Sequence, residues 1–215
     1  MTVLDGNKKL PELILRQGNL PEVLTDTDLG HLIQGSDDRR YSLIKRSLAR
    51  GDLVQIRRGL YVLGDLYRRK TIHALELAQK IYGPSYISFE SALSYWGLIP
   101  EAVHTVTSGS LARSQDFETP FGYFAYTRIP VRPLYAGVTR KIDDGATFLI
   151  AQPLRALADY VYASRKIWKV KDLAESLRIA ELPGLEAEEF EAMSEWFRNH
   201  RVRIFLEDYR KMRHS

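Results

Sequence analysis

Apolar residues in the first fifty positions recur at intervals of three and four, which is the spacing of one face of a helix. This pattern predicts three helices, over residues 8–16, 25–33 and 37–50. Thr25 and Asp28 resemble a capping box at the start of the second helix. Ser36 suits the N-cap of the third helix, and Gly51 suits its end.

The third predicted helix has two faces of different chemistry. Tyr41, Ile44 and Leu48 fall at i, i+3 and i+7, so we expect them to form its buried face. The opposite face carries three arginines within about 40° of one another, at about 100° per residue. They are Arg39, Arg46 and Arg50, and no acidic residue interrupts them. A column of one charge is less typical of a solvated surface than of a surface that binds phosphate.

A β-hairpin is predicted directly after this helix. Two short β-rich runs, residues 53–57 and 60–63, flank the sequence Arg57-Arg58-Gly59. Gly59 supplies the positive φ that a tight turn requires. The hairpin therefore presents a doubly basic tip.

Helix, turn, helix and hairpin in this order predict a winged helix–turn–helix domain over residues 1–67. In such a domain the third helix enters the major groove of DNA and the hairpin tip contacts the backbone or the minor groove. The expected DNA-binding residues carry basic or hydroxyl side chains on these two elements: Arg39, Arg40, Ser42, Lys45, Arg46, Arg50, Arg57 and Arg58.

Residues 68–215 mix the two periodicities and predict a second, mixed α/β domain that ends in helices. Helices are expected over 72–81 and 89–96, and Ser88 is expected to cap the latter. Strands are expected at 86–87, 103–107, 122–129 and 148–151, and helices from Pro153 onward. Asp159 lies one step off an apolar helical stripe, which favours a buried or half-buried hydrogen bond. The fold class is thus α+β.

Composition adds little until the charge is followed along the chain. The 215 residues carry a net charge of +4. Residues 1–36 have a net charge of −2, residues 37–70 carry ten Lys and Arg against four Asp, and residues 71–215 are balanced. The excess therefore falls on the third helix and the hairpin, as expected for an element that binds phosphate.

Few enzyme signatures are present. The chain has no Cys, which excludes disulfides, thiolate catalysis and Cys-based metal sites. It has no nucleotide-binding glycine loop and no closely spaced His pair. We therefore expect no catalytic residues, no metal and no cofactor. No apolar stretch is long enough for a membrane span, and no secretory signal is found, so the expected location is the cytoplasm.

Two alternatives stay open. Asp116 and Glu118 lie two apart in a predicted loop, and paired carboxylates can hold Mg²⁺, so a metal-dependent nuclease is one alternative. A protein-interaction module without DNA binding is the other, because a helix–turn–helix surface can also bind protein. Only the arginine column argues against it.

Three ordered segments resemble the AbiEi-type antitoxins, which are transcriptional regulators of bacterial abortive-infection toxin–antitoxin operons. They are the hairpin Arg58-Gly59-Leu60-Tyr61, the stretch 86–100 with its Ser-Ala-Leu and Gly-Leu landmarks, and the segment 151–159. The resemblance covers about residues 25–165, and the last fifty residues show no landmark of the family.

The resemblance implies an N-terminal winged helix and a C-terminal antitoxin domain. It implies a regulator that binds inverted repeats in double-stranded promoter DNA and represses its own operon. It also implies antagonism of a nucleotidyltransferase-like toxin. By position, it assigns DNA contact to Arg39, Arg46 and Arg50 and to Arg57 and Arg58; it assigns the antitoxin role to no named residue.

Overall fold

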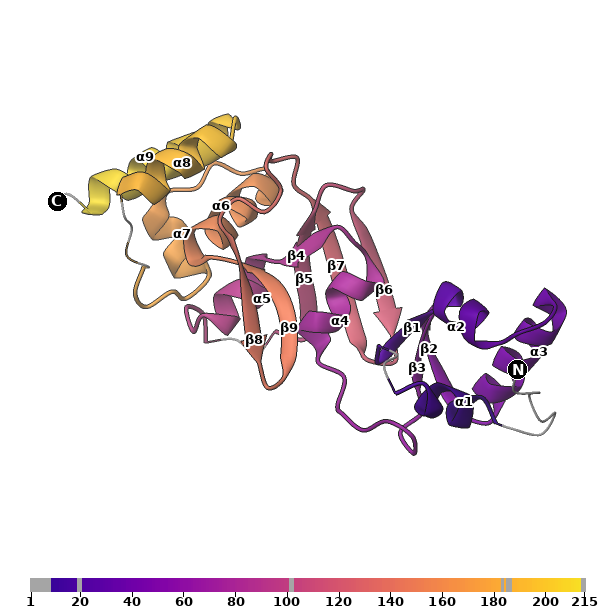
Figure 1. Cartoon of the computed structure of the whole chain (residues 1–215). Helices are drawn as coiled ribbons and strands as arrows, with labels where there is room; N and C mark the ends of the chain where they lie inside the picture. Colours follow the sequence, from indigo (N-terminus) through magenta and orange to yellow (C-terminus); the bar gives the residue numbers. More distant parts are fainter. Residues whose placement is uncertain (1–8, 19–20, 101–102, 183, 185–186, 214–215) are drawn as a thin grey trace. The chain divides into compact units, whose positions relative to one another are not determined.

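The computed structural model describes residues 9–18, 21–100, 103–182, 184 and 187–213. The chain forms two compact units. Unit 1 comprises Met1–Ile72 with Thr119–Phe121, and unit 2 comprises His73–Glu118 with Gly122–Ser215. Each unit combines helices with a β-sheet (Figure 1), so the α+β class is confirmed. The domain boundary expected after residue 67 stays a prediction.

Unit 1 contains an antiparallel sheet of order β1–β3–β2, accompanied by helices. In chain order the elements are α1 (Leu10–Arg16), β1 (Val23–Thr25), α2 (Asp26–Leu32), α3 (Asp37–Ala49), β2 (Leu53–Arg57) and β3 (Leu60–Leu63). The expected helices and hairpin are present. The expected helix start at Lys8 lies outside the described residues. Strand β1 was not expected, because three residues are too few to show an alternation.

The core of unit 1 is built from the apolar stripes of its helices and the inner face of its sheet. Its buried members are Leu10, Ile14, Leu24, Leu29, Ile33, Ile44, Leu53 and Tyr61.

Both helix caps expected in unit 1 are confirmed. The Thr25 Oγ1 accepts from the Asp28 N–H at 3.1 Å while an Asp28 carboxylate oxygen accepts from the Thr25 N–H at 2.8 Å. The Ser36 Oγ accepts from the Arg39 N–H at 3.4 Å.

Unit 2 contains a mixed sheet of order β6–β7–β5–β4–β9–β8. Strands β4 and β9 are parallel, as are β5 and β7, whereas β4–β5 and β8–β9 are antiparallel pairs. Its strands are β4 (Ser85–Ile87), β5 (Thr105–Ser110), β6 (Gln115–Thr119), β7 (Gly122–Arg128), β8 (Val138–Asp143) and β9 (Ala146–Ala151). Its helices are α4 (Ala74–Ile81), α5 (Phe89–Tyr95), α6 (Pro153–Ser164), α7 (Val170–Ser176), α8 (Ala187–Trp196) and α9 (His200–Arg213).

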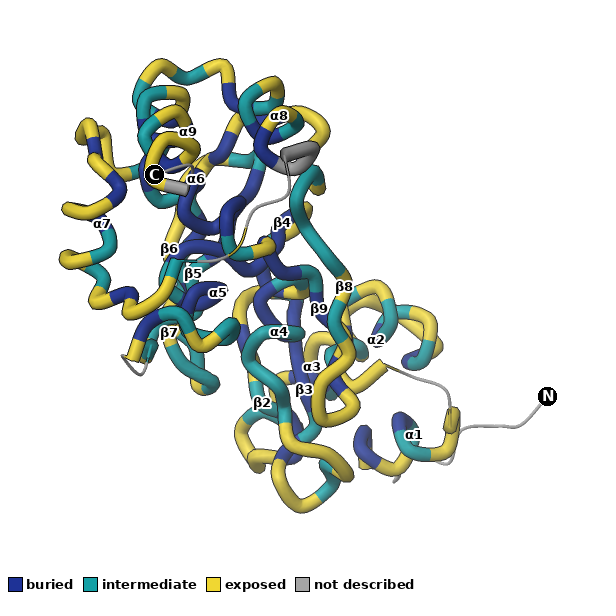
Figure 2. Tube along the Cα trace, turned by 90° about the vertical axis from the view of Figure 1, so that its left-hand side faces the viewer, coloured by how far each residue is buried: buried dark blue, intermediate teal, exposed yellow. Residues whose placement is uncertain are grey.

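The helical end of unit 2 follows the sheet in sequence, and α6 connects the two. Helix α6 packs on α5, α9 and β9. Figure 1 shows α6 to α9 gathered together beyond the strands. The buried positions concentrate in β4 and α6, which are largely dark blue in Figure 2. The expected helical C-terminal part is therefore present. Across the described ranges, no helix is both long and apolar enough to cross a membrane.

Several expectations for unit 2 were wrong. Residues 115–119 are the edge strand β6 and not a loop, because a strand with one apolar residue between charged ones gives too weak an alternation to be recognised. Strand β8, at the other edge, was not expected. Helix α4 begins at Ala74 and not at Ile72, since His73 is extended and takes the N-cap position.

Candidate nucleic-acid interface

Helix α3 is anchored by one side and open on the other. Ile44 and Ser47 are buried, and Leu43 and Leu48 are half-buried against the core of unit 1. These positions lie on one face of the helix, as expected for a helix that packs by a single stripe. The rest of the helix circumference is therefore available for another function.

Four of the expected contact residues lie on that open side. Arg39, Ser42, Lys45 and Arg46 are all exposed. The Arg46 Nε donates to the backbone oxygen of Ser42 at 3.3 Å, which directs the arginine along the helix surface. These four residues contribute three cationic groups and one hydroxyl to this side of α3.

The other two expected α3 contacts are already engaged within unit 1. The Arg40 guanidinium pairs with the Asp37 carboxylate at 3.1 Å, and its side chain is only 23% exposed. The Arg50 Nε pairs with Asp52 at 2.8 Å, and Asp52 also accepts from the Tyr67 hydroxyl at 3.3 Å. Both arginines therefore hold the fold around α3, and Arg50 still presents about half of its side chain to solvent.

Tyr41 is not buried, contrary to the expectation from its spacing. Its side chain is 59% exposed, and the Arg40 guanidinium carbon lies 5.3 Å from its ring centroid. The buried residues of α3 are Ile44 and Ser47, so the buried face is turned toward Ser47 and away from Tyr41. Because Ser47 is small and polar, it does not appear in a count of apolar positions.

The β2–β3 hairpin presents Arg57 and Arg58, both exposed, at its turn. Gly59 has φ +77°, as expected, and a Cβ there would lie 3.0 Å from a carboxylate oxygen of Asp26. Burial, followed by the nearby Asp26 charge and a hydrogen bond to Asp26, raises the pKa of Tyr61 above its ordinary value. Asp26, the first residue of α2, therefore contacts the hairpin at two points. One is the turn at Gly59, and the other is Tyr61 in strand β3.

Asp116 and Glu118 project from the edge strand β6, where both are exposed. Glu118 accepts a hydrogen bond from the Tyr123 hydroxyl at 3.0 Å, and this bond is the main reason that the pKa of Tyr123 is raised. Among the described residues, no group of three or more His, Cys, Asp or Glu side chains is close enough to hold a metal ion.

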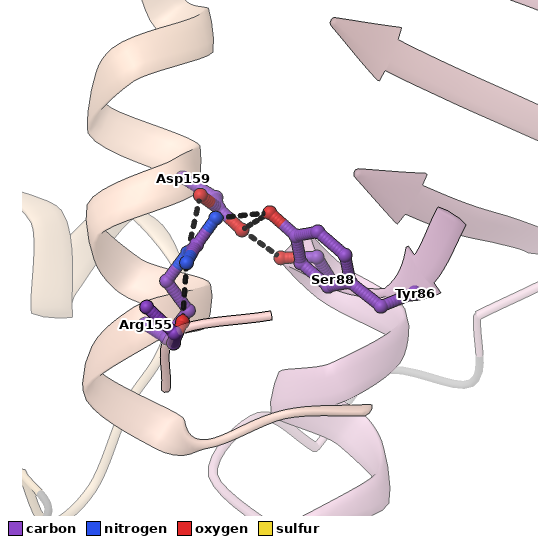
Figure 3. A network of polar contacts seen from close by, with 5 residues as sticks. Tyr86, Ser88, Arg155 and Asp159 are labelled. Atoms are coloured by element: carbon purple, nitrogen blue, oxygen red, sulfur yellow. Dashed lines mark hydrogen bonds and ion pairs between the residues drawn. The ribbon is translucent and has the colours of Figure 1, made fainter. Parts of the chain in front are cut away.

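A second polar cluster lies inside unit 2 and joins residues far apart in sequence (Figure 3). An Asp159 carboxylate oxygen accepts from the Tyr86 hydroxyl at 2.9 Å and from the Ser88 hydroxyl at 2.7 Å. Its other oxygen accepts from the Arg155 Nε at 3.0 Å. The Arg155 guanidinium also donates to the Tyr86 hydroxyl and to the backbone oxygen of Ala136.

This cluster is sealed from solvent. The Arg155 and Asp159 side chains are both 0% exposed. Burial raises the pKa of Tyr86 well above its ordinary value, and burial also raises the pKa of Asp159 despite the adjacent guanidinium. We assign the cluster a structural role, because no substrate can reach it.

The expected hydrogen bonding of Asp159 is confirmed, whereas the expected capping by Ser88 is wrong. The Ser88 hydroxyl bonds to Asp159 and makes no cap bond to α5. Sequence reasoning did not identify Tyr86 or Arg155. The available signal was Arg155 four residues before Asp159, a spacing that places both on one side of a helix.

The cluster also joins two of the segments on which the expected family resemblance rests. Tyr86 and Ser88 belong to the segment 86–100, and Arg155 and Asp159 belong to the segment 151–159. The chain matches no protein-family model, and no curated protein matches it significantly in sequence.

Proposed function

We propose that unit 1 is a winged-helix DNA-binding domain and that the chain is a transcriptional regulator. The observation that carries the proposal is the exposed cationic surface of two elements. Arg39, Lys45 and Arg46 on α3 and Arg57 and Arg58 at the hairpin turn are all exposed. Arginine and lysine contacts to phosphate supply affinity, and groove contacts by a recognition helix supply specificity.

The order of elements supports the same proposal. A capped α2, a short turn, α3 and then the β2–β3 hairpin follow one another without insertion. In a winged helix this order presents the third helix to the major groove and the hairpin to the backbone.

Within this class, we propose a regulator of the AbiEi antitoxin kind that represses its own operon through promoter inverted repeats and antagonises a nucleotidyltransferase-like toxin. The support is the ordered resemblance of three segments, two of which meet at the buried cluster of Asp159. In this proposal the chain is a regulator and not an enzyme.

DNA binding is tested by fluorescence anisotropy with a labelled duplex of about 30 base pairs, at about 50 and 200 mM salt. We expect binding that weakens steeply with salt. The Arg57→Ala/Arg58→Ala variant should bind all sequences more weakly and lower the salt slope by about two. An Arg113→Ala/Arg140→Ala variant, which removes the same charge from exposed positions of unit 2, is the matched control and should bind like the wild type.

The alternatives give different results in the same preparation. Failure to bind any duplex at low salt contradicts the proposal and favours a protein-interaction module. Cleavage of plasmid with Mg²⁺ or Mn²⁺ that is lost in Asp116→Ala favours the nuclease.

For the antitoxin assignment, capture of genomic fragments should return an inverted repeat upstream of the chain's own reading frame. Co-expression should relieve the toxicity of a neighbouring nucleotidyltransferase-like protein.

A further inference from the structure

Exposed aromatic residues occur singly on most proteins and need no explanation by themselves. Tyr41 differs because it stands on the open side of α3 among the cationic side chains. Four residues after it lies Lys45, also exposed, on the same edge of the helix. A tyrosine beside a lysine on a basic helix has two donors available to a polyanion.

The open side of α3 has two edges, with short side chains between them. At about 100° per residue, Tyr41 and Lys45 fall on one edge, Arg39 and Arg46 fall on the other, and Ser42 falls between them. All five are exposed. The arginine column is therefore only one half of this surface.

The centre between these edges carries short side chains. Ser42 and Ala49 are exposed there, and Asp38 in the first turn, also exposed, falls between Ser42 and Lys45. Short side chains allow the backbone of the helix to approach base edges closely.

A helix and the major groove have similar widths, about 10–12 Å each, so the two edges of an inserted helix face the two phosphate backbones. Tyrosine hydroxyls and lysine ammonium groups both donate to phosphate oxygens. Resting on the proposed DNA-binding function, we infer that Tyr41 and Lys45 form a second phosphate-contacting edge of α3, opposite the Arg39–Arg46 edge.

Arg40 is a positioning residue for this edge. Its guanidinium is held by Asp37 at 3.1 Å and lies 5.3 Å from the centroid of the Tyr41 ring. The ring is therefore supported before DNA arrives, which lowers the entropy lost when its hydroxyl is fixed by a phosphate.

The test compares Tyr41→Phe with the wild type on the labelled mixed-sequence duplex at low salt. Removing the hydroxyl keeps the exposed ring, so the fold is retained. We expect binding about ten- to a hundredfold weaker, as for one hydrogen bond to a charged group, with an unchanged salt slope because the hydroxyl that is removed carries no charge. Lys45→Ala should weaken binding and lower the slope by about one.

Tyr123→Phe is the matched control. Tyr123 is 55% exposed, close to the 59% of Tyr41, but it lies in unit 2. It should leave DNA binding unchanged. The losses from Tyr41→Phe and Arg46→Ala should add, since the two residues contact different backbones.

The two proposals fail in different ways. If Arg46→Ala weakens binding but Tyr41→Phe binds like the wild type, the second edge is wrong and the DNA-binding function stands. If the wild type binds no duplex, both proposals are wrong. An equal loss in Tyr41→Phe and Tyr123→Phe also overturns the inference, because the effect would not be specific to α3.

Discussion

Asp159 and Arg155 are both fully buried, so neither charge is stabilised by water. Each is stabilised by the other and by hydrogen bonds, three to the carboxylate and a further two from the guanidinium. Removal of one partner from such a pair leaves a charge buried without compensation, which costs more than the pair itself contributes.

Asp159→Asn keeps the shape of the side chain and removes its charge. We expect the free energy of unfolding of unit 2 to fall by about 3–5 kcal/mol, because the Arg155 guanidinium loses its counter-charge. Urea denaturation followed by tryptophan fluorescence measures this. The Arg155→Met/Asp159→Leu double variant, which removes both charges, should be more stable than Asp159→Asn. The reverse order would show that the pair is not held as a unit.

Gly109 is needed where the ring of Tyr86 crosses β5. Tyr86 is the direct neighbour of Gly109 across the β4–β5 pair, and a Cβ at Gly109 would lie 2.6 Å from the Tyr86 hydroxyl oxygen. Gly109→Ala should therefore destabilise unit 2 by about 1–3 kcal/mol, as overpacking does. In a Tyr86→Ala background the same change should cost much less. An equal cost in both backgrounds would contradict the clash.

At the scale of elements, the N-terminal caps of α2 and α3 differ in the number and length of their hydrogen bonds. Helix α2 has a reciprocal pair of bonds between Thr25 and Asp28, whereas α3 has a single bond of 3.4 Å to Ser36. Capping side chains satisfy backbone N–H groups that have no partner in the first turn. We infer that the first turn of α2 is held more firmly than the first turn of α3.

Thr25→Ala should lower the free energy of unfolding of unit 1 by about 1 kcal/mol, since it removes the hydroxyl that accepts from the Asp28 N–H and donates to the Asp28 carboxylate. Far-UV circular dichroism during urea denaturation is the measurement. Thr25→Ser keeps the hydroxyl and should retain most of the stability. Ser36→Ala should cost less than Thr25→Ala; a larger cost would contradict the ranking drawn from the distances.

Helices and strands with complete local signals were predictable, and edge strands were not. The helices starting at Asp26, Asp37 and Pro153 each combine an apolar stripe with a cap or a proline at the first turn. In strand β6 only Phe117 and Thr119 are partly buried, so its sequence shows little alternation of apolar and polar residues. It is a strand because it forms hydrogen bonds with β7. Pairing between strands is a tertiary interaction that no local window contains.

On the scale of the whole molecule, the two units differ in net charge, and each has its own buried core. The net positive charge falls in residues 37–70, and the residues after them are balanced. Each unit has its own buried apolar residues. Units with separate cores need not unfold together.

All three tryptophans, Trp96, Trp168 and Trp196, belong to unit 2. Tryptophan fluorescence therefore reports the unfolding of unit 2, whereas far-UV circular dichroism reports both units. We expect the two urea transitions not to coincide. Thr25→Ala should shift only the dichroism curve, and Asp159→Asn should shift both. Coincident transitions in all three proteins would show that the units unfold as one.

The sequence by itself determined the α+β class, the order of elements from α2 to β3, the capping of two helices and the location of the positive charge. These features follow from interactions within about ten residues, which a single sequence records. Only the tertiary structure decided that Tyr41 is exposed and that Tyr86 meets Arg155 and Asp159. Each of these depends on which surface another element covers, and that choice is made by packing across the chain.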